Sequence, residues 1–406
     1  MEYNIHTLDN GIRVLHIPSK IPVSYVGVVL DVGTRDELEN ESGMAHFIEH
    51  MLFKGTEKRK STQIISCLEN IGGQIDAYTT KEETYIYSVV PRRYTLKAVD
   101  LLSDIVMNSI FPEKELQKER VVVIDEIQSY NDSPSELIYD DFEEMIFPND
   151  AIGRNILGNE ASLATFDSAK LKAFTNRCYT ANRMVVFALG NLKFDRFVKY
   201  VEGCFNLHSS DNKADRKSPS VYSPVQRVVN KDTYQAHCII GNRCCNITSE
   251  DRYTLALLNN ILGGPNMSSL LNMAVRERNG LCYTIESGVT SYVDTGVWSI
   301  YFGCDEKNLK RTKSICFNQL DKLCNNPISA SRLSTAKRQF IGQMLIANQN
   351  LENVVLNVSK MVLHNIPLLE NKKVIERINQ ISSEEMLSLS QTLFARENLS
   401  VLTYIE

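Results

Sequence analysis

Apolar and polar positions along the chain predict two series of elements in the same order. β-rich segments open each series, at residues 12–17 and 23–32 in the first half and at residues 226–229 and 236–241 in the second. A helix that ends in a glycine turn follows, then a block of strands and then another helix. Strands that occur in runs and are followed by helices favour an α+β fold with antiparallel sheets over alternating βαβ units.

The repeated order indicates two homologous domains. The polar segment from Ser209 to Pro224 has almost nothing to bury and divides the chain into parts of similar length, which is typical of a linker. The sequence therefore predicts an N-terminal domain at residues 1–208 and a C-terminal domain at residues 225–406, each with an antiparallel sheet packed against helices.

The segment Gly43–Gly55, GMAHFIEHMLFKG, predicts a buried helix with polar side chains in its middle. Apolar residues surround those polar ones on nearly every side. At about 100° per residue, His46 and His50 lie roughly 40° apart on one face, with Glu49 beside them. Two histidines four residues apart can ligate one zinc ion, and the carboxylate between them can take a proton from water on that metal. This is the H-x-x-E-H arrangement of inverted-motif zinc enzymes.

The alternative interpretation is that His46 and His50 are core histidines near a helical glutamate. Two imidazoles and an unpaired carboxylate inside an apolar helix would be costly to desolvate, and a metal ion would offset that cost. Burial therefore favours the metal interpretation.

Catalytic zinc takes a third protein ligand and keeps its fourth position open. The segment from Glu113 to Asn131 contains no helix breaker and predicts a long helix, with Glu119 and Glu126 two turns apart on one face. Spacing alone does not select Glu126 over Asp125 or Glu119. Each of these acids could equally lie on a solvated surface.

Composition narrows the class of protein. Of the 406 residues, 43% are hydrophobic and 23% are charged, which is ordinary for a globular chain of about two domains. The net charge of −5 argues against a nucleic-acid partner, and no apolar run reaches the length of a membrane span. The N-terminus lacks the features of a secretory signal, and the ten cysteines contain no C-x-x-C pair. We therefore expect a cytoplasmic protein with reduced, structural thiols.

The stretch HFIEHMLFKGT (residues 46–56), together with Glu126 at its distance downstream, resembles the pitrilysin and mitochondrial-processing-peptidase family of inverted-motif zinc peptidases. The resemblance extends over the whole chain, which is similar to a half-length, bacterial-type member. It implies that Glu126 is the third metal ligand. It also implies that Glu119 supports the site by orienting a ligand.

Two further segments resemble substrate-binding parts of that family. Residues 70–90 are similar to its substrate-binding edge strand, which implies that a peptide adds as a new strand. The residues implied to contact it are Ile75, Asp76, Ala77, Tyr78 and Thr79. Residues 274–285 are similar to an arginine–tyrosine segment of the C-terminal domain, and this implies that Arg276 and Tyr283 hold the substrate.

This chain departs from the family pattern at Asp76, where family members usually have Asn. An ionised carboxylate cannot donate a hydrogen bond to a substrate. The C-terminal domain also differs from the N-terminal one. If residues 255–262 correspond to the motif helix, Ala256, Asn259 and Asn260 take the places of the two histidines and the glutamate. The second domain is therefore predicted to bind no metal and to hold substrate.

We expect a zinc metalloendopeptidase with one Zn²⁺ per chain that hydrolyses unstructured peptides or unfolded proteins in a closed chamber. Glu49 would accept the water proton and pass it to the leaving amine. The half-length chain implies a homodimer, or a heterodimer with a related chain. Two alternatives are a processing-peptidase subunit that needs a non-catalytic partner and a non-enzymatic structural relative. The complete set His46, Glu49, His50 and Glu126 argues against the latter.

Overall fold

The computed structural model describes residues 2–207 and 214–406, and it divides into two compact units. Unit 1 comprises Met1–Gln128, Arg154–Lys217 and Asn348–Leu368, whereas unit 2 comprises Ser129–Gly153, Ser218–Ala347 and Leu369–Glu406. Residues 209–213 of the predicted linker lie outside the described residues. The domain limits at residues 208 and 225 stay a prediction, because the compact units are not continuous in sequence.

Unit 1 is built on a six-stranded sheet with the order β1-β2-β6-β3-β5-β4. Most neighbours are antiparallel, whereas β2 and β6 run parallel. Strand β4 forms one edge of the sheet and pairs only with β5 among the described residues. The strands are β1 (Asn4–Thr7), β2 (Arg13–Pro18), β3 (Val23–Leu30), β4 (Gln74–Thr79), β5 (Thr84–Pro91) and β6 (Met184–Gly190).

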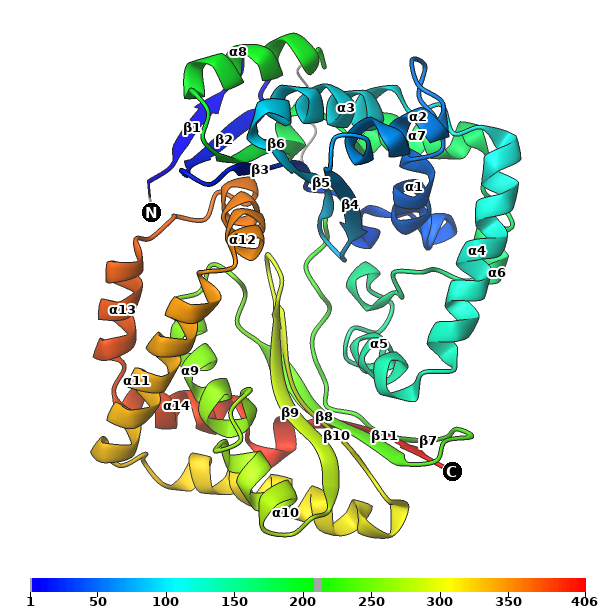
Figure 1. Cartoon of the computed structure of the whole chain (residues 1–406). Helices are drawn as coiled ribbons and strands as arrows, with labels where there is room; N and C mark the ends of the chain where they lie inside the picture. Colours follow the sequence, from blue (N-terminus) through cyan, green and yellow to red (C-terminus); the bar gives the residue numbers. More distant parts are fainter. Residues whose placement is uncertain (1, 208–213) are drawn as a thin grey trace. The chain divides into compact units, whose positions relative to one another are not determined.

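Successive side chains of the central strands point to opposite faces of this sheet, and both faces are covered by a core. On β3, Val26 and Val28 belong to one core and Val29 to another. The first core packs against most helices of unit 1, and the second packs against α12, which lies on the opposite face in Figure 1. The helices are α1 (Met44–Leu52), α2 (Ser61–Glu69), α3 (Thr95–Asn108), α4 (Glu113–Asn131), α6 (Glu160–Leu163), α7 (Ser168–Cys178), α8 (Phe194–Cys204) and α12 (Leu351–Leu363).

Unit 2 is built on a five-stranded sheet with the order β7-β11-β8-β10-β9. The strands are β7 (Gln226–Asn230), β8 (Ala236–Cys244), β9 (Cys282–Ser291), β10 (Gly296–Cys304) and β11 (Ser400–Ile405). Its cores contain Trp298 on one face of the sheet and Phe142 of α5 on the other. The helices are α5 (Pro134–Ile146), α9 (Asp251–Gly263), α10 (Glu306–Asn325), α11 (Ala330–Ala347), α13 (Asn371–Gln380) and α14 (Ser383–Leu393).

The two sheets share one topology. Strands β2-β6-β3-β5-β4 and β7-β11-β8-β10-β9 match in chain order, in neighbours and in direction. The predicted α+β fold with two related domains is therefore confirmed. Each sheet is antiparallel except at one pair, because β6 inserts beside β2 and β11 beside β7, and each of these pairs runs parallel.

The repeat also shows a reciprocal exchange of helices. Helices α3, α4 and α5 follow β5 in the same order as α10, α11 and α12 follow β10. Helix α5 lies on β8 and β11 in unit 2, and α12 lies on the matching strands β3 and β6 in unit 1. Each half of the sequence therefore supplies the helix that covers one sheet face in the other unit.

Candidate metal centre

Helix α1 carries both histidines of the motif and is buried on nearly every side. Its nine residues begin after Gly43, which has a left-handed backbone with φ of 86°. A Cβ atom at this position would lie 2.7 Å from the carbonyl oxygen of Leu157, so only glycine fits. His46 is 8% exposed, and His50 lies one turn later on the same face.

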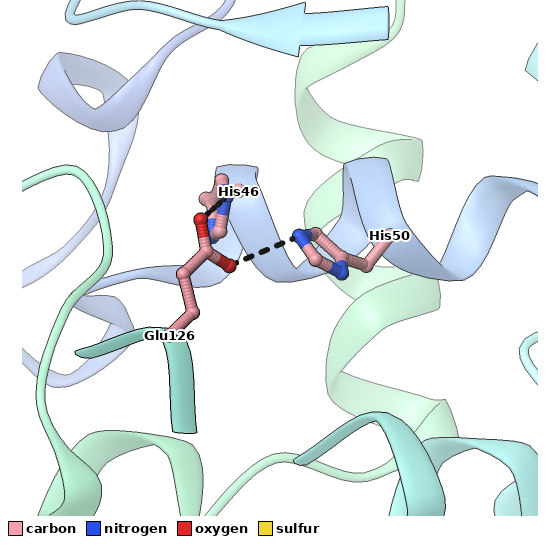
Figure 2. A group of neighbouring side chains, drawn as sticks. All are labelled: His46, His50 and Glu126. Atoms are coloured by element: carbon pink, nitrogen blue, oxygen red, sulfur yellow. Dashed lines mark ion pairs between the residues drawn. The ribbon is translucent and has the colours of Figure 1, made fainter. Parts of the chain in front are cut away.

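The structure brings His46, His50 and Glu126 together, although Glu126 lies on a different helix. One ligand atom from each residue lies within 4.8 Å of the others, and no other such group occurs among the described residues. The Glu126 carboxylate reaches both rings, at 3.8 Å from His46 Nε2 and 3.5 Å from His50 Nε2 (Figure 2). The α4 helix therefore places Glu126 opposite the two histidines, as expected of a third ligand.

Glu119 lies two turns before Glu126 on α4, and its carboxylate orients the ring of His50. The Nδ1 atom of His50 lies 3.0 Å from Glu119 Oε1, and Lys54 Nζ lies 2.5 Å from Glu119 Oε2. Burial raises the pKa of Glu119, but the bonds from His50 and Lys54 outweigh that effect and the net pKa is lowered. The ionised carboxylate accepts a hydrogen bond from the Nδ1–H of His50, which leaves Nε2 free to face Glu126.

The pKa values of the two histidines shift in opposite directions. Burial, with a contribution from the charge of His50, lowers the pKa of His46 to about 3, so its ring is neutral at neutral pH. Burial also lowers the pKa of His50, but Glu119, Glu126 and Glu49 outweigh it and the net pKa is raised. The buried Nδ1 of His46 has no hydrogen-bond partner among the described residues. The carboxylates of Glu119, Glu126 and Glu49 favour a positive charge beside His50. A metal ion such as zinc would supply that charge, so the set of donor atoms fits a metal ion.

Glu49 lies beside the group of three without belonging to it. Its Oε2 accepts a hydrogen bond of 2.6 Å from the hydroxyl of Thr79 on β4. Burial raises the pKa of Glu49, whereas the Thr79 bond and the charge of His50 oppose that rise. A buried carboxylate with a raised pKa is suited to accept a proton and release it again.

The predicted substrate-contacting residues Ile75 to Thr79 lie on the edge strand β4. Ile75, Ala77 and Thr79 alternate with Asp76 and Tyr78, so the two sets point to opposite faces of the sheet. Thr79 reaches Glu49 on the side of α1. Asp76 accepts hydrogen bonds from the backbone N–H of Ala77 at 2.8 Å and from the hydroxyl of Tyr87 at 3.3 Å.

Arg276 and Tyr283 belong to unit 2, where they line a pocket of about 590 Å³. The Arg276 guanidinium lies 5.3 Å from the centre of the Tyr283 ring, a cation–π arrangement, and Tyr283 is 81% exposed. Ala256, Asn259 and Asn260 of α9 line the same pocket. Helix α9 follows β8 as α1 follows β3, so the pocket occupies the position in unit 2 that the His-His-Glu group occupies in unit 1.

Sequence reasoning missed two residues that support this centre. Lys54 lies just after the end of α1 at Leu52, so no helical spacing indicates it as a partner of Glu119. Glu37 accepts hydrogen bonds from the backbone at the start of α1, and no spacing rule indicates it. None of the helices in the described ranges, 2–207 and 214–406, combines the length and the apolar composition needed to cross a membrane.

Comparison with known proteins defines the class of this fold and site. Residues 13–160 match the family description "Insulinase (Peptidase family M16)", and residues 165–340 match "Peptidase M16 inactive domain". All three residues of the His-His-Glu group lie in the first match. The molecule is thus a two-domain protein of the peptidase class.

Similar chains place it in one family. A protein described as "Uncharacterized zinc protease YmxG" from Bacillus subtilis is 32% identical over 397 residues, which cover 97% of this chain and 96% of that protein. "Uncharacterized zinc protease Rv2782c" from Mycobacterium tuberculosis is 30% identical, with coverage of 96% and 90%. This chain belongs to peptidase family M16, the insulinase family, as its sequence motif predicts.

Two solved structures share the fold. The structure described as a peptidase M16 inactive domain from Pseudomonas fluorescens superposes with a TM-score of 0.92 at 18% identity, covering 100% of this chain and 98% of that one. A protease from Helicobacter pylori superposes with a TM-score of 0.90 at 20% identity, covering 100% and 99%. At these identities the likeness concerns the fold alone.

Proposed function

We propose that this protein is a zinc metalloendopeptidase that hydrolyses peptide bonds of unstructured peptides. The observation that carries the proposal is the convergence of His46, His50 and Glu126 from two helices, with Glu49 beside them. The names of the similar zinc proteases support the choice of zinc, and one His-His-Glu group among the described residues supports one ion per chain.

When bound, zinc supplies a Lewis acid that polarises the scissile carbonyl and acidifies a water molecule. Glu49, whose pKa burial raises, accepts the proton of the attacking water. Thr79 restrains that carboxylate through its hydrogen bond. Glu49 then returns the proton to the nitrogen of the leaving amine, which is a stronger base than a carboxylate.

One edge of β4 pairs with no strand of the described residues, and this edge supports an extended peptide as the substrate. A peptide that adds to β4 as a strand would form main-chain hydrogen bonds along residues 75–79. Thr79, at the end of that edge, contacts Glu49, so the added strand would pass the catalytic carboxylate. A folded domain presents few free strands. We therefore propose that substrates are unfolded, and that a closed chamber excludes stable domains.

A peptide library digested by the purified chain tests this function. Cleavage is expected in the untreated protein, is expected to stop after a chelator removes metal, and is expected to return with zinc. A stable globular domain in the same mixture should remain intact. Cleavage that continues in the metal-free chain would overturn the proposal.

A further inference from the structure

A fully buried carboxylate, Glu37, contacts the beginning of helix α1. Its side chain precedes α1 in the sequence and is only 4% exposed. Oε2 accepts a hydrogen bond of 3.0 Å from the backbone N–H of Gly43, and Oε1 accepts one of 2.9 Å from that of Ala45. Each carboxylate oxygen therefore binds one amide at the start of the helix that carries His46, Glu49 and His50.

Helix α1 needs such an external partner. The first four amides of a helix have no acceptor inside it, and Gly43 at the N-cap position has no side chain to supply one. A helix of nine residues has little stability of its own. A carboxylate at this end also interacts favourably with the helix dipole. Glu37 thus replaces the missing capping side chain.

The backbone of Glu37 is itself fixed by a side chain from another segment. Arg154 donates hydrogen bonds to the carbonyl oxygens of Glu37 at 2.8 Å and of Leu38 at 2.9 Å. Burial raises the pKa of Glu37, whereas the amides of Ala45 and Gly43 and the charge of Arg154 favour its ionised form. The carboxylate of Glu37 therefore occupies a position that is costly to desolvate. There its two oxygens accept hydrogen bonds from the amides at the beginning of α1.

We propose that Glu37 is a positioning residue for the metal centre, because its carboxylate fixes the axial position and rotation of α1 and thereby aims His46 and His50 at Glu126. The inference rests on the proposed function. Ala45, one of the two residues bound by Glu37, is adjacent to His46. A small rotation of α1 moves both imidazoles together away from Glu126, and a misplacement of about 1 Å can lower a catalytic rate about 100-fold.

The test compares Glu37→Gln with a matched control, Glu41→Gln. Glu41 also accepts a backbone N–H, from Leu38 at 2.9 Å, but it caps the short helix at Glu39–Glu41, which carries no residue of the centre. In Glu37→Gln an amide NH₂ replaces one oxygen and cannot accept a backbone N–H. Three quantities are measured in the full chain: zinc affinity by chelator competition, kcat and KM for an unstructured peptide, and amide exchange of α1 in the metal-free protein.

Glu37→Gln is expected to lower zinc affinity about tenfold or more, a size typical of residues that orient metal ligands. It should lower kcat with little change in KM, and amides at the start of α1 should exchange faster. Glu41→Gln should change none of these three quantities, even if it lowers the melting temperature. Should Glu37→Gln not fold, Glu37→Asp replaces it, since the shorter carboxylate keeps the charge but cannot reach both amides.

Wild-type zinc affinity or wild-type exchange at α1 in a folded Glu37 variant would overturn the inference, as would equal losses in the Glu41 control. The amide-exchange measurement needs neither metal nor activity. Failure of the wild-type chain to bind zinc would instead overturn the proposed function and the metal role of Glu37. Unchanged amide exchange at α1 in Glu37→Gln would overturn the inference about Glu37 but not the proposed function.

Discussion

At the scale of single residues, the centre depends on which nitrogen of each imidazole is free. Glu119 accepts a hydrogen bond from the Nδ1–H of His50 and forms an ion pair with Lys54. The Nε2 atom of His50 therefore points to Glu126. A carboxylate behind a metal-binding histidine fixes the ring and raises its basicity. The tautomer of the His50 ring is therefore set by a residue on the side away from Glu126.

Replacing Glu119 by Gln should weaken zinc binding about 10–100-fold, because the neutral amide loses the charge that supports His50 and Lys54. Competition with a chromophoric chelator measures the affinity. Glu115→Gln on the same helix is the control, since its partner is the exposed Lys118 at 2.8 Å. Equal zinc affinity in the Glu119 variant and the control would contradict this role.

The residues of the motif helix were readable from sequence because of their spacing and their apolar surroundings. Helix α1 and helix α4 occur where the glycine boundaries and the absence of breakers predict them. Selection of Glu126 needed the family resemblance, because spacing along α4 fits Glu119 equally. Contacts between distant segments, such as Thr79 with Glu49, follow from the sheet register, which the pattern of one strand does not contain.

At the scale of elements, α12 is tied to the sheet of unit 1 by a buried ionic group. Glu83, just before β5, is 1% exposed and lies 3.0 Å from Lys360 Nζ and 2.6 Å from His364 Nε2. Burial raises the pKa of Glu83, but His364 and Lys360 outweigh it and lower the pKa to about 2. The ionised carboxylate therefore stabilises the docking of this helix.

Glu83→Gln should lower the free energy of unfolding at pH 7 by about 3 kcal/mol, because two donors lose a buried counter-charge. The pKa of Glu83 is depressed from 4.5, so its contribution is complete above about pH 4.5 and is lost as pH falls toward about 2. Urea unfolding of both chains across this range measures the difference. A difference that stays constant below pH 4.5 would contradict the assignment.

At the scale of the whole molecule, each half of the sequence needs a helix from the other. Without α12, one face of the first sheet would expose apolar side chains that α12 now covers, among them Leu15, Val29, Tyr85 and Phe187. The order of elements along the chain does not indicate which sheet a helix such as α12 covers. The sequence patterns therefore did not predict that α5 and α12 are exchanged between the two halves. The expected homodimer stays a prediction.

A chain truncated to residues 1–217 should aggregate or bind a hydrophobic dye, because a large apolar patch is left uncovered. Coexpression with residues 218–406 should restore a soluble complex, since those residues supply α12. Size-exclusion chromatography and dye fluorescence distinguish the states. A monomeric 1–217 fragment that unfolds cooperatively and binds no dye would show that the exchange is not needed.

We propose that His46, His50 and Glu126 hold zinc while Glu49 moves a proton. The most direct measurement is the zinc content and peptide cleavage of Glu49→Gln beside His50→Ala. We predict that Glu49→Gln keeps about one zinc per chain and loses cleavage, whereas His50→Ala loses both. A metal-free Glu49→Gln chain, or one that cleaves at the wild-type rate, would contradict the account.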